Sequence, residues 1–186
     1  MKRIAIFASG NGSNFEALAA ACLSGEVAAE VALMVCDKPG AGVVARAERL
    51  GVSALVLSPR DFSSKSEYEA LIVERLREEG ISLICLAGYM RIIGETLLGA
   101  FEGKIINVHP SLLPAFKGAH AIEQALEYGV KVFGVSIHFV TEELDSGGII
   151  DQASFRYEGS DVRELEEMVH KVEHPLYISC LKRLVE

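Results

Sequence analysis

The sequence changes character within residues 104–118, KIINVHPSLLPAFKG. It begins as a short apolar run, which is typical of a buried strand. Asn107 and His109 lie two residues apart, so on a strand both side chains point to the same face. Pro110 cannot continue a central strand, and a later proline and glycine keep regular structure from resuming. We therefore expect a carboxamide and an imidazole side by side where a strand ends, the edge at which open α/β sheets bind ligands.

Strands and helices alternate before this stretch. Apolar runs predict strands at residues 4–8, 30–36, 54–57 and 81–87, and helices are expected at residues 15–23, 43–50, 66–79 and in a short segment ending near residue 100. This alternation predicts a parallel sheet with right-handed crossovers.

The pattern is different after residue 118. A helix is expected at residues 119–128, then strands at 130–140 and 149–157. The polar link between these two strands is too short for a crossover helix, so we expect them to pair antiparallel. Ser160 and Asp161 can cap a final amphipathic helix, which Pro175 is expected to interrupt.

These elements predict one α/β domain over residues 1–186. Its sheet is expected to be open, twisted and mostly parallel, Rossmann-like, with about seven strands, helices on both faces and an antiparallel C-terminal part. A chain of 186 residues, half of them hydrophobic, can bury the core that such a domain needs.

Composition argues against several classes of protein. The net charge of −8 disfavours a general nucleic-acid binder. No stretch approaches the length of a membrane-spanning helix, and the apolar run after Arg3 is too short for a signal peptide. The four cysteines form no CxxC pair, and we expect reduced, buried thiols in a cytoplasmic protein: Cys22, Cys36, Cys85 and Cys180.

A glycine-rich turn, SGNGSN at residues 9–14, joins the first strand to the first helix. Such a turn places backbone N–H groups and a helix N-terminus around an anion. As a dinucleotide fingerprint it is incomplete: Phe15 occupies the third glycine position, and Asp37 is only the nearest candidate for a ribose-reading acid. A dehydrogenase is therefore disfavoured. On these residues alone, a phosphate site and a plain tight turn are equally acceptable.

Two stretches together carry a resemblance to a known family: NVHPSLLP at residues 107–114 and HFVTEELDSGG at residues 138–148. With them, the chain resembles the folate-dependent formyltransferases over essentially its whole length. The resemblance implies that a formyl group moves from 10-formyltetrahydrofolate to the amino group of glycinamide ribonucleotide, a step of purine biosynthesis. It also implies that the N-terminal half, about residues 1–100, binds phosphate, while residues from about 101 to 186 carry catalysis and folate binding.

The family's catalytic Asn, His and Asp match Asn107, His109 and Asp145 in order and local context. Attack of an amine on a formamide creates a tetrahedral oxyanion, and the leaving nitrogen must gain a proton. Asn107 would donate to the oxyanion, and a protonated His109 would donate to it and deliver the proton. Asp145 would favour the imidazolium or organise a relaying water. Without the resemblance, the sequence favours an ordinary turn at Asp145 and, at His109, a structural histidine whose hydrogen bonds are satisfied within the protein.

The resemblance also implies ligand-binding residues. The phosphorylated substrate would contact Gly12, Ser13, Asn14 and Glu173. The folate would contact Lys65, Met90, Arg91, Ile92, Ile93, Asn107, Val140 and Asp145. By themselves, Arg91 and Glu173 read as surface charges, and a lysine at position 65 cannot bind a carboxylate in bidentate fashion.

Other functions stay open. A formyltetrahydrofolate deformylase hydrolyses the same donor, and a non-catalytic folate- or nucleotide-binding module would need no triad. The cradle Gly12-Ser13-Asn14 favours a transferase. A tRNA formyltransferase is disfavoured, since we expect neither a further C-terminal domain nor a basic surface for tRNA. The expected partners are the two small molecules, without nucleic acid, membrane or metal, and the expected state is a monomer or homodimer.

Overall fold

The computed structural model describes all 186 residues and places seven strands in one sheet. The strands are β1 (Lys2–Ala8), β2 (Ala29–Cys36), β3 (Ala54–Val56), β4 (Leu83–Leu86), β5 (Ile105–His109), β6 (Val132–Phe139) and β7 (Ile149–Arg156). The helices are α1 (Ser13–Leu23), α2 (Gly42–Arg49), α3 (Lys65–Glu78), α4 (Glu95–Ala100), α5 (Ala121–Tyr128) and α6 (Val162–Val185), with a 3-10 turn, η1 (Pro59–Asp61). The predicted order of elements is confirmed, and most of their ends differ by one or two residues.

The strands lie in the order β3-β2-β1-β4-β5-β6-β7. Pairs among β1 to β5 are parallel, whereas β6 runs antiparallel to β5, and β7 to β6. This confirms the predicted mixed sheet. Because β2 and β3 lie on one side of β1 and the later strands on the other, the winding reverses between β1 and β4. Sheets of this kind bind ligands beyond the carboxyl ends of the strands at such a reversal.

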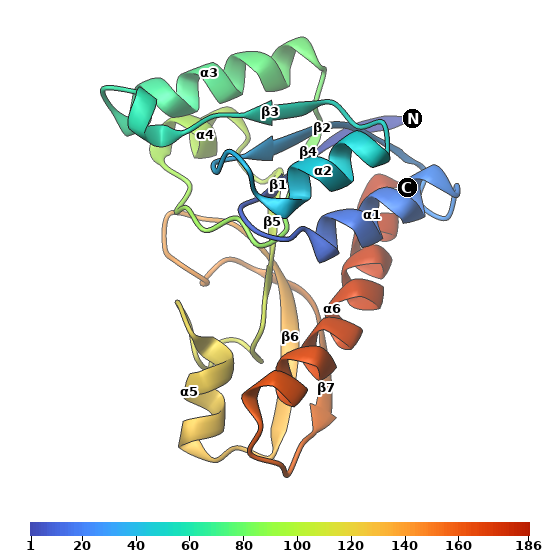
Figure 1. Ribbon diagram of the computed structural model, residues 1–186, viewed down its shortest axis with the longest axis vertical. Coiled ribbons are helices and arrows are strands. Elements are labelled where there is room, and N and C mark those ends of the chain that lie inside the picture. The colour runs from blue at the N-terminus through green and yellow to red at the C-terminus, as the bar shows by residue number, and fades with distance from the viewer.

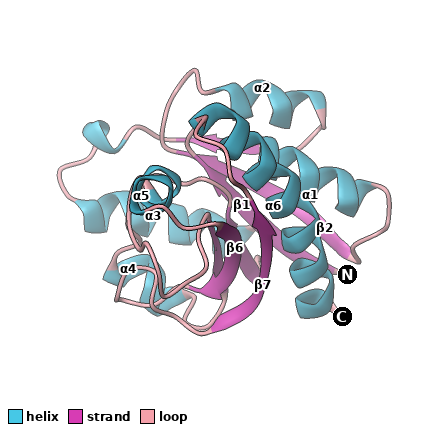
Figure 2. Ribbon diagram, turned by 90° about the horizontal axis from the view of Figure 1, so that it is seen from below, coloured by secondary structure: helices cyan, strands magenta, loops and turns pink.

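Helices cover both faces of the sheet (Figures 1 and 2). α1, α2 and α6 pack against one apolar core, and α3 and α4 against the other. Side chains along β1 alternate between the two cores, Ile4 and Ile6 in the first and Ala5 and Phe7 in the second. A parallel strand buried on both faces must be apolar throughout, which explains the uninterrupted run.

The predicted break at Pro175 is wrong, because α6 continues through it to Val185. A proline inside a helix removes one backbone hydrogen bond. Buried side chains on both sides of it hold the helix in place, among them Leu165 and Val169 before it and Tyr177 and Leu181 after it. The unbroken helix packs against α1 and so brings α6 side chains to the carboxyl end of β1.

All four cysteines are unpaired thiols, as predicted, although Cys22 is only half-buried. No helix combines the length and the apolar character that crossing a membrane would need.

Candidate active site

A cavity of about 870 Å³ opens at the carboxyl ends of β1, β4 and β5, where the winding of the sheet reverses. Five segments and two helix side chains line it: residues 10–14, 86–93, 107–110, 118–123 and 138–145 (without Phe139), with His170 and Glu173 of α6. Residues from both ends of the chain therefore meet in one cavity of the size that holds small-molecule ligands.

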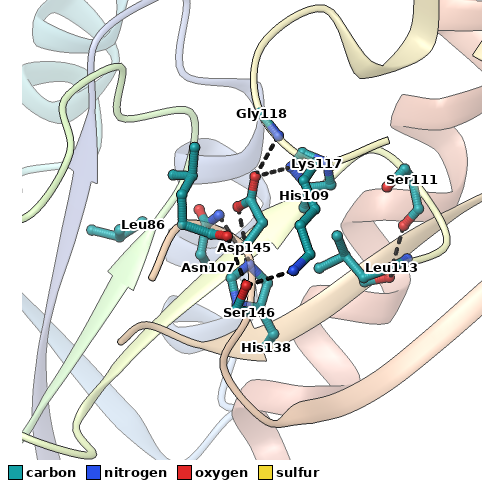
Figure 3. Close-up of polar contacts among 12 residues, drawn as sticks. Leu86, Asn107, His109, Ser111, Leu113, Lys117, Gly118, His138, Asp145 and Ser146 are labelled. Carbon is teal, nitrogen blue, oxygen red and sulfur yellow. Dashed lines mark hydrogen bonds and ion pairs between the residues drawn. The ribbon is translucent and has the colours of Figure 1, made fainter. Parts of the chain in front are cut away.

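His109, the last residue of β5, is buried between two acceptors. Its Nε2 lies 2.8 Å from the Phe116 carbonyl oxygen, and its Nδ1 lies 3.4 Å from Asp145 Oδ2. The same Asp145 oxygen accepts a hydrogen bond of 2.8 Å from the Gly118 amide (Figure 3). The structure thus brings together the predicted histidine and carboxylate, although one ends strand β5 and the other lies in the loop between β6 and β7.

The strand pairing places Asn107 beside a second histidine. Asn107 of β5 pairs with His138 of β6, and Asn107 Nδ2 lies 3.3 Å from His138 Nε2. His138 Nδ1 lies 2.9 Å from the Phe139 carbonyl, which can only accept, so Nδ1 carries a proton. His138 Nε2 also lies 3.6 Å from Asp145 Oδ1, so this carboxylate faces both buried histidines.

The loop between β6 and β7 brings Asp145 to this position. Asp145 itself has a positive φ of 51°. Two residues later, a Cβ at Gly147 would overlap the Phe139 carbonyl oxygen, so only glycine allows the loop to fold back over β6. Lys117 Nζ donates to Ser146 Oγ at 2.6 Å and ties this loop to the one that follows β5 (Figure 3).

A buried polar network supports the turn that follows His109. Ser136 Oγ donates to the Ser111 carbonyl at 2.7 Å and accepts from the Leu113 amide at 3.0 Å, while Gln152 Nε2 donates to the Leu113 carbonyl at 3.0 Å. The Leu113–Pro114 peptide bond in this turn is cis. The backbone that carries the histidine is therefore held by side chains of β6 and β7.

The predicted phosphate cradle lies at the N-terminus of α1. Gly12 has a φ of 83°, and a Cβ there would lie 2.6 Å from Val43 Cγ2, so this position requires glycine. Asn14 Nδ2 donates to Glu173 Oε2 at 3.1 Å, and Asn14 Oδ1 is buried without a partner. Glu173 is buried and lines the cavity, so it is not the surface carboxylate that its sequence context suggests.

The predicted folate-contacting residues fall into two places. Met90, Arg91, Ile92, Ile93 and Val140 line the main cavity. Lys65 does not: it lines an adjoining cavity of about 550 Å³, which shares residues 89–93 with the main one. The segment 89–93 thus forms the boundary between the two cavities.

Sequence reasoning missed His138 as a member of the site. It lies in the quoted stretch 138–148, but no local pattern distinguishes it from a core histidine. Its place opposite Asn107 follows from the register of β5 with β6, which no local pattern reveals. The Gly118 amide was missed as well, since a backbone donor carries no side-chain signal. No group of three or more His, Cys, Asp or Glu side chains in the structure is arranged to hold a metal ion.

Burial lowers the pKa of His138 below its ordinary value of 6.5, although the Phe139 carbonyl and the Asp145 carboxylate oppose the shift. Burial also lowers the pKa of His174. Just below pH 6.5 the unfolded chain binds protons on these rings that the folded chain does not, so falling pH favours unfolding. Each such proton lowers the free energy of unfolding by at most about 1.4 kcal/mol for each unit by which the pH falls.

We therefore expect the denaturation midpoint to fall between pH 6.5 and pH 5, and His138→Gln to make that fall shallower. Urea titrations at several pH values measure both. An identical pH dependence in the variant and the wild type would contradict this account of His138.

The chain is similar to known proteins over nearly its whole length. The sequence profile described as formyl transferase matches residues 2–181. Phosphoribosylglycinamide formyltransferase of Bacillus subtilis is 48% identical over 186 residues, which cover 100% of this chain and 95% of that protein. The trifunctional purine biosynthetic protein adenosine-3 of Gallus gallus is 40% identical over 97% of this chain, which spans 18% of that longer protein.

A solved structure gives the same result for the fold. Glycinamide ribonucleotide transformylase 1 from Geobacillus kaustophilus superposes with a TM-score of 0.98 at 50% identity, covering 100% of both chains. The resemblance found in residues 107–114 and 138–148 is thereby confirmed. With a matching profile over nearly all its length and relatives of this similarity, the chain belongs to the formyl transferase family.

Proposed function

We propose that this protein transfers the formyl group of 10-formyltetrahydrofolate to the amino group of glycinamide ribonucleotide, N1-(5-phospho-D-ribosyl)glycinamide, in de novo purine biosynthesis. The observation that carries the proposal is the convergence of Asn107, His109 and Asp145 in one cavity with the glycine-rich turn at α1. Relatives of the family that bear the name of this activity match the whole chain. Four unpaired thiols fit a reducing compartment such as the cytoplasm.

The phosphorylated substrate would bind with its phosphate at the N-terminus of α1, beside Ser13 and Asn14, where backbone amides and the helix dipole favour an anion. Its amino end would reach Glu173. The donor would lie along residues 90–93 and Val140, which line the same cavity. This arrangement supports a direct transfer, since donor and acceptor would share one cavity with Asn107, His109 and Asp145.

In the reaction, the acceptor nitrogen forms a bond to the formyl carbon, and the carbonyl electrons move to oxygen. Asn107 Nδ2 and the Nε2 proton of His109 would stabilise that oxyanion. The Phe116 carbonyl accepts this Nε2 proton in the structure, and the formyl oxygen would take its place. Since Asp145 is also an acceptor, a ring with protons on both nitrogens satisfies both neighbours of His109.

Collapse of the intermediate breaks the bond from the formyl carbon to the folate N10. The electron pair of that bond stays on N10, which takes a proton from His109, while the acceptor nitrogen loses one proton. Asp145 would stabilise the imidazolium and relay the released proton through water. Atoms and charge balance without a metal or redox partner.

The test is a steady-state assay with 10-formyltetrahydrofolate, run with and without glycinamide ribonucleotide. Tetrahydrofolate that forms only with the ribonucleotide, in equal amount with the formylated product, supports the transferase. Formate released at the same rate without the ribonucleotide would contradict it and favour a deformylase.

Ser13→Ala should lower kcat/KM for glycinamide ribonucleotide about tenfold, roughly what one hydrogen bond to a charged group contributes. The KM for the donor should stay unchanged. An acceptor that lacks the phosphate provides the control, because its kcat/KM should not change. An equal loss with both acceptors would argue against a phosphate contact at this residue.

A further inference from the structure

Three buried polar side chains hold the segment between β4 and α4, residues 87–94. Ser9 Oγ accepts from the Met90 amide at 2.8 Å, and Glu69 Oε1 accepts from the Gly94 amide at 2.6 Å. Asp37 Oδ2 accepts from Arg91 Nε at 3.0 Å. Ser9 and Glu69 hold the backbone, whereas Asp37 holds a side chain, so Asp37 determines the direction of one guanidinium.

The pair formed by Asp37 and Arg91 is asymmetric in its burial. The Asp37 side chain is 1% exposed and Arg91 is 46% exposed. Asp37 Oδ1 is buried and has no hydrogen-bond partner. A buried carboxylate with one partner is a costly way to stabilise a fold, because most of its hydration is lost for a single contact. The arrangement is better explained by what it does to the exposed guanidinium.

Arg91 has unused hydrogen-bonding capacity directed at ligand space. Its Nε is taken by Asp37, and neither Nη group donates to the protein. Arg91 lines both cavities, and Lys65 is the other cation of the smaller one. The Glu69 carboxylate nearby is occupied by the backbone amides of Gly94 and Leu97. A fork of two Nη groups matches the two oxygens of a carboxylate.

We propose that Asp37 is a positioning residue for the formyl donor, holding Arg91 so that its two Nη groups bind a carboxylate of the donor's anionic glutamate tail. The inference rests on the proposed function, because the tail belongs to the folate. An arginine side chain has many rotamers, and ordering it before binding removes that entropy from the binding step. The gain is therefore confined to ligands that carry the carboxylate.

The experiment measures equilibrium binding of two ligands to the full chain: tetrahydrofolate, and a counterpart that ends in a neutral benzamide without the glutamate. The wild type should prefer the tail-bearing ligand, and Asp37→Asn should reduce that preference about five- to tenfold. Binding of the benzamide ligand should be unchanged. Equal weakening of both ligands, or an unchanged preference, would overturn the proposal.

A double-mutant cycle shows whether Asp37 acts through Arg91. Arg91→Gln should leave only the part of the preference that Lys65 supplies, and adding Asp37→Asn should then have no further effect on it. A further loss in the Arg91→Gln background would overturn the proposal. Asp151→Asn is the matched control, since it removes a carboxylate from the Asp151–Arg183 pair, whose residues line neither cavity. It should leave the preference intact.

Arg91→Lys tests the same idea with Asp37 in place, should Asp37→Asn fail to fold. A lysine has one nitrogen, which the buried carboxylate would engage, so Arg91→Lys should resemble Arg91→Gln. A wild-type preference in Arg91→Lys would show that charge alone suffices and would overturn the proposal. Absence of formyl transfer by a wild type that still binds folate through Arg91 would count against the proposed function and not against this role of Asp37.

Discussion

His109→Ala should lower kcat roughly 10³-fold, within the range that a general acid contributes, while both ligands bind about as well as before. The reason lies in the contacts of the ring. His109 Nε2 donates its proton to the Phe116 carbonyl oxygen at 2.8 Å, and Nδ1 lies 3.4 Å from the Asp145 carboxylate. Its contribution arises as negative charge develops on the formyl oxygen, so removing the ring affects the transition state more than the ground state.

Single-turnover rates and separate binding titrations for each ligand distinguish this outcome from a general loss of the site. The folded state of the variant is checked by its urea midpoint, since alanine leaves a gap at a buried position. A rate within tenfold of the wild type would rule out His109 as the proton donor. A large loss of ligand affinity at an intact midpoint would instead assign the ring a binding role.

Local periodicity was enough to predict most of the fold. The apolar runs of β1 and β4 have no polar face, and that is what burial between two helix layers requires. Asn107 and His109 share a face because the strand period is two, so their neighbourhood could be predicted from spacing alone. Only the resemblance to the family predicted that Asp145 lies near His109. Residue periodicity describes strands and helices and does not show how a loop folds back over a strand.

The remaining features depend on contacts between distant segments. His138 reaches Asn107 through strand register, and Glu173 reaches Asn14 because α6 packs against α1. The proline rule describes an isolated helix, and packing on both sides of Pro175 outweighs it in α6. Lys65 was expected near the folate tail only from its position in the family, where relatives often carry an arginine, and the structure places it in the adjoining cavity.

Asp145→Asn should lower kcat by roughly 10²- to 10³-fold with little change in either KM. The substitution keeps the size of the side chain and one oxygen acceptor for the Gly118 amide, now 2.8 Å away. It removes the negative charge that faces His109 at 3.4 Å and His138 at 3.6 Å. The imidazolium formed during proton transfer would then lose its counter-charge in a buried, weakly screened site.

The decisive comparison is the double variant His109→Ala with Asp145→Asn. If Asp145 acts by stabilising the His109 imidazolium, its removal has little left to affect once the ring is gone, and the double variant should be about as slow as His109→Ala. Losses that multiply would mean that the relay of the acceptor's proton, and not the contact with His109, accounts for most of the effect of Asp145. Asp151→Asn, in the exposed pair with Arg183, changes the same net charge outside the cavity and should keep wild-type turnover. A loss there comparable to that of Asp145→Asn would attribute the effect to overall charge and not to the contact with His109.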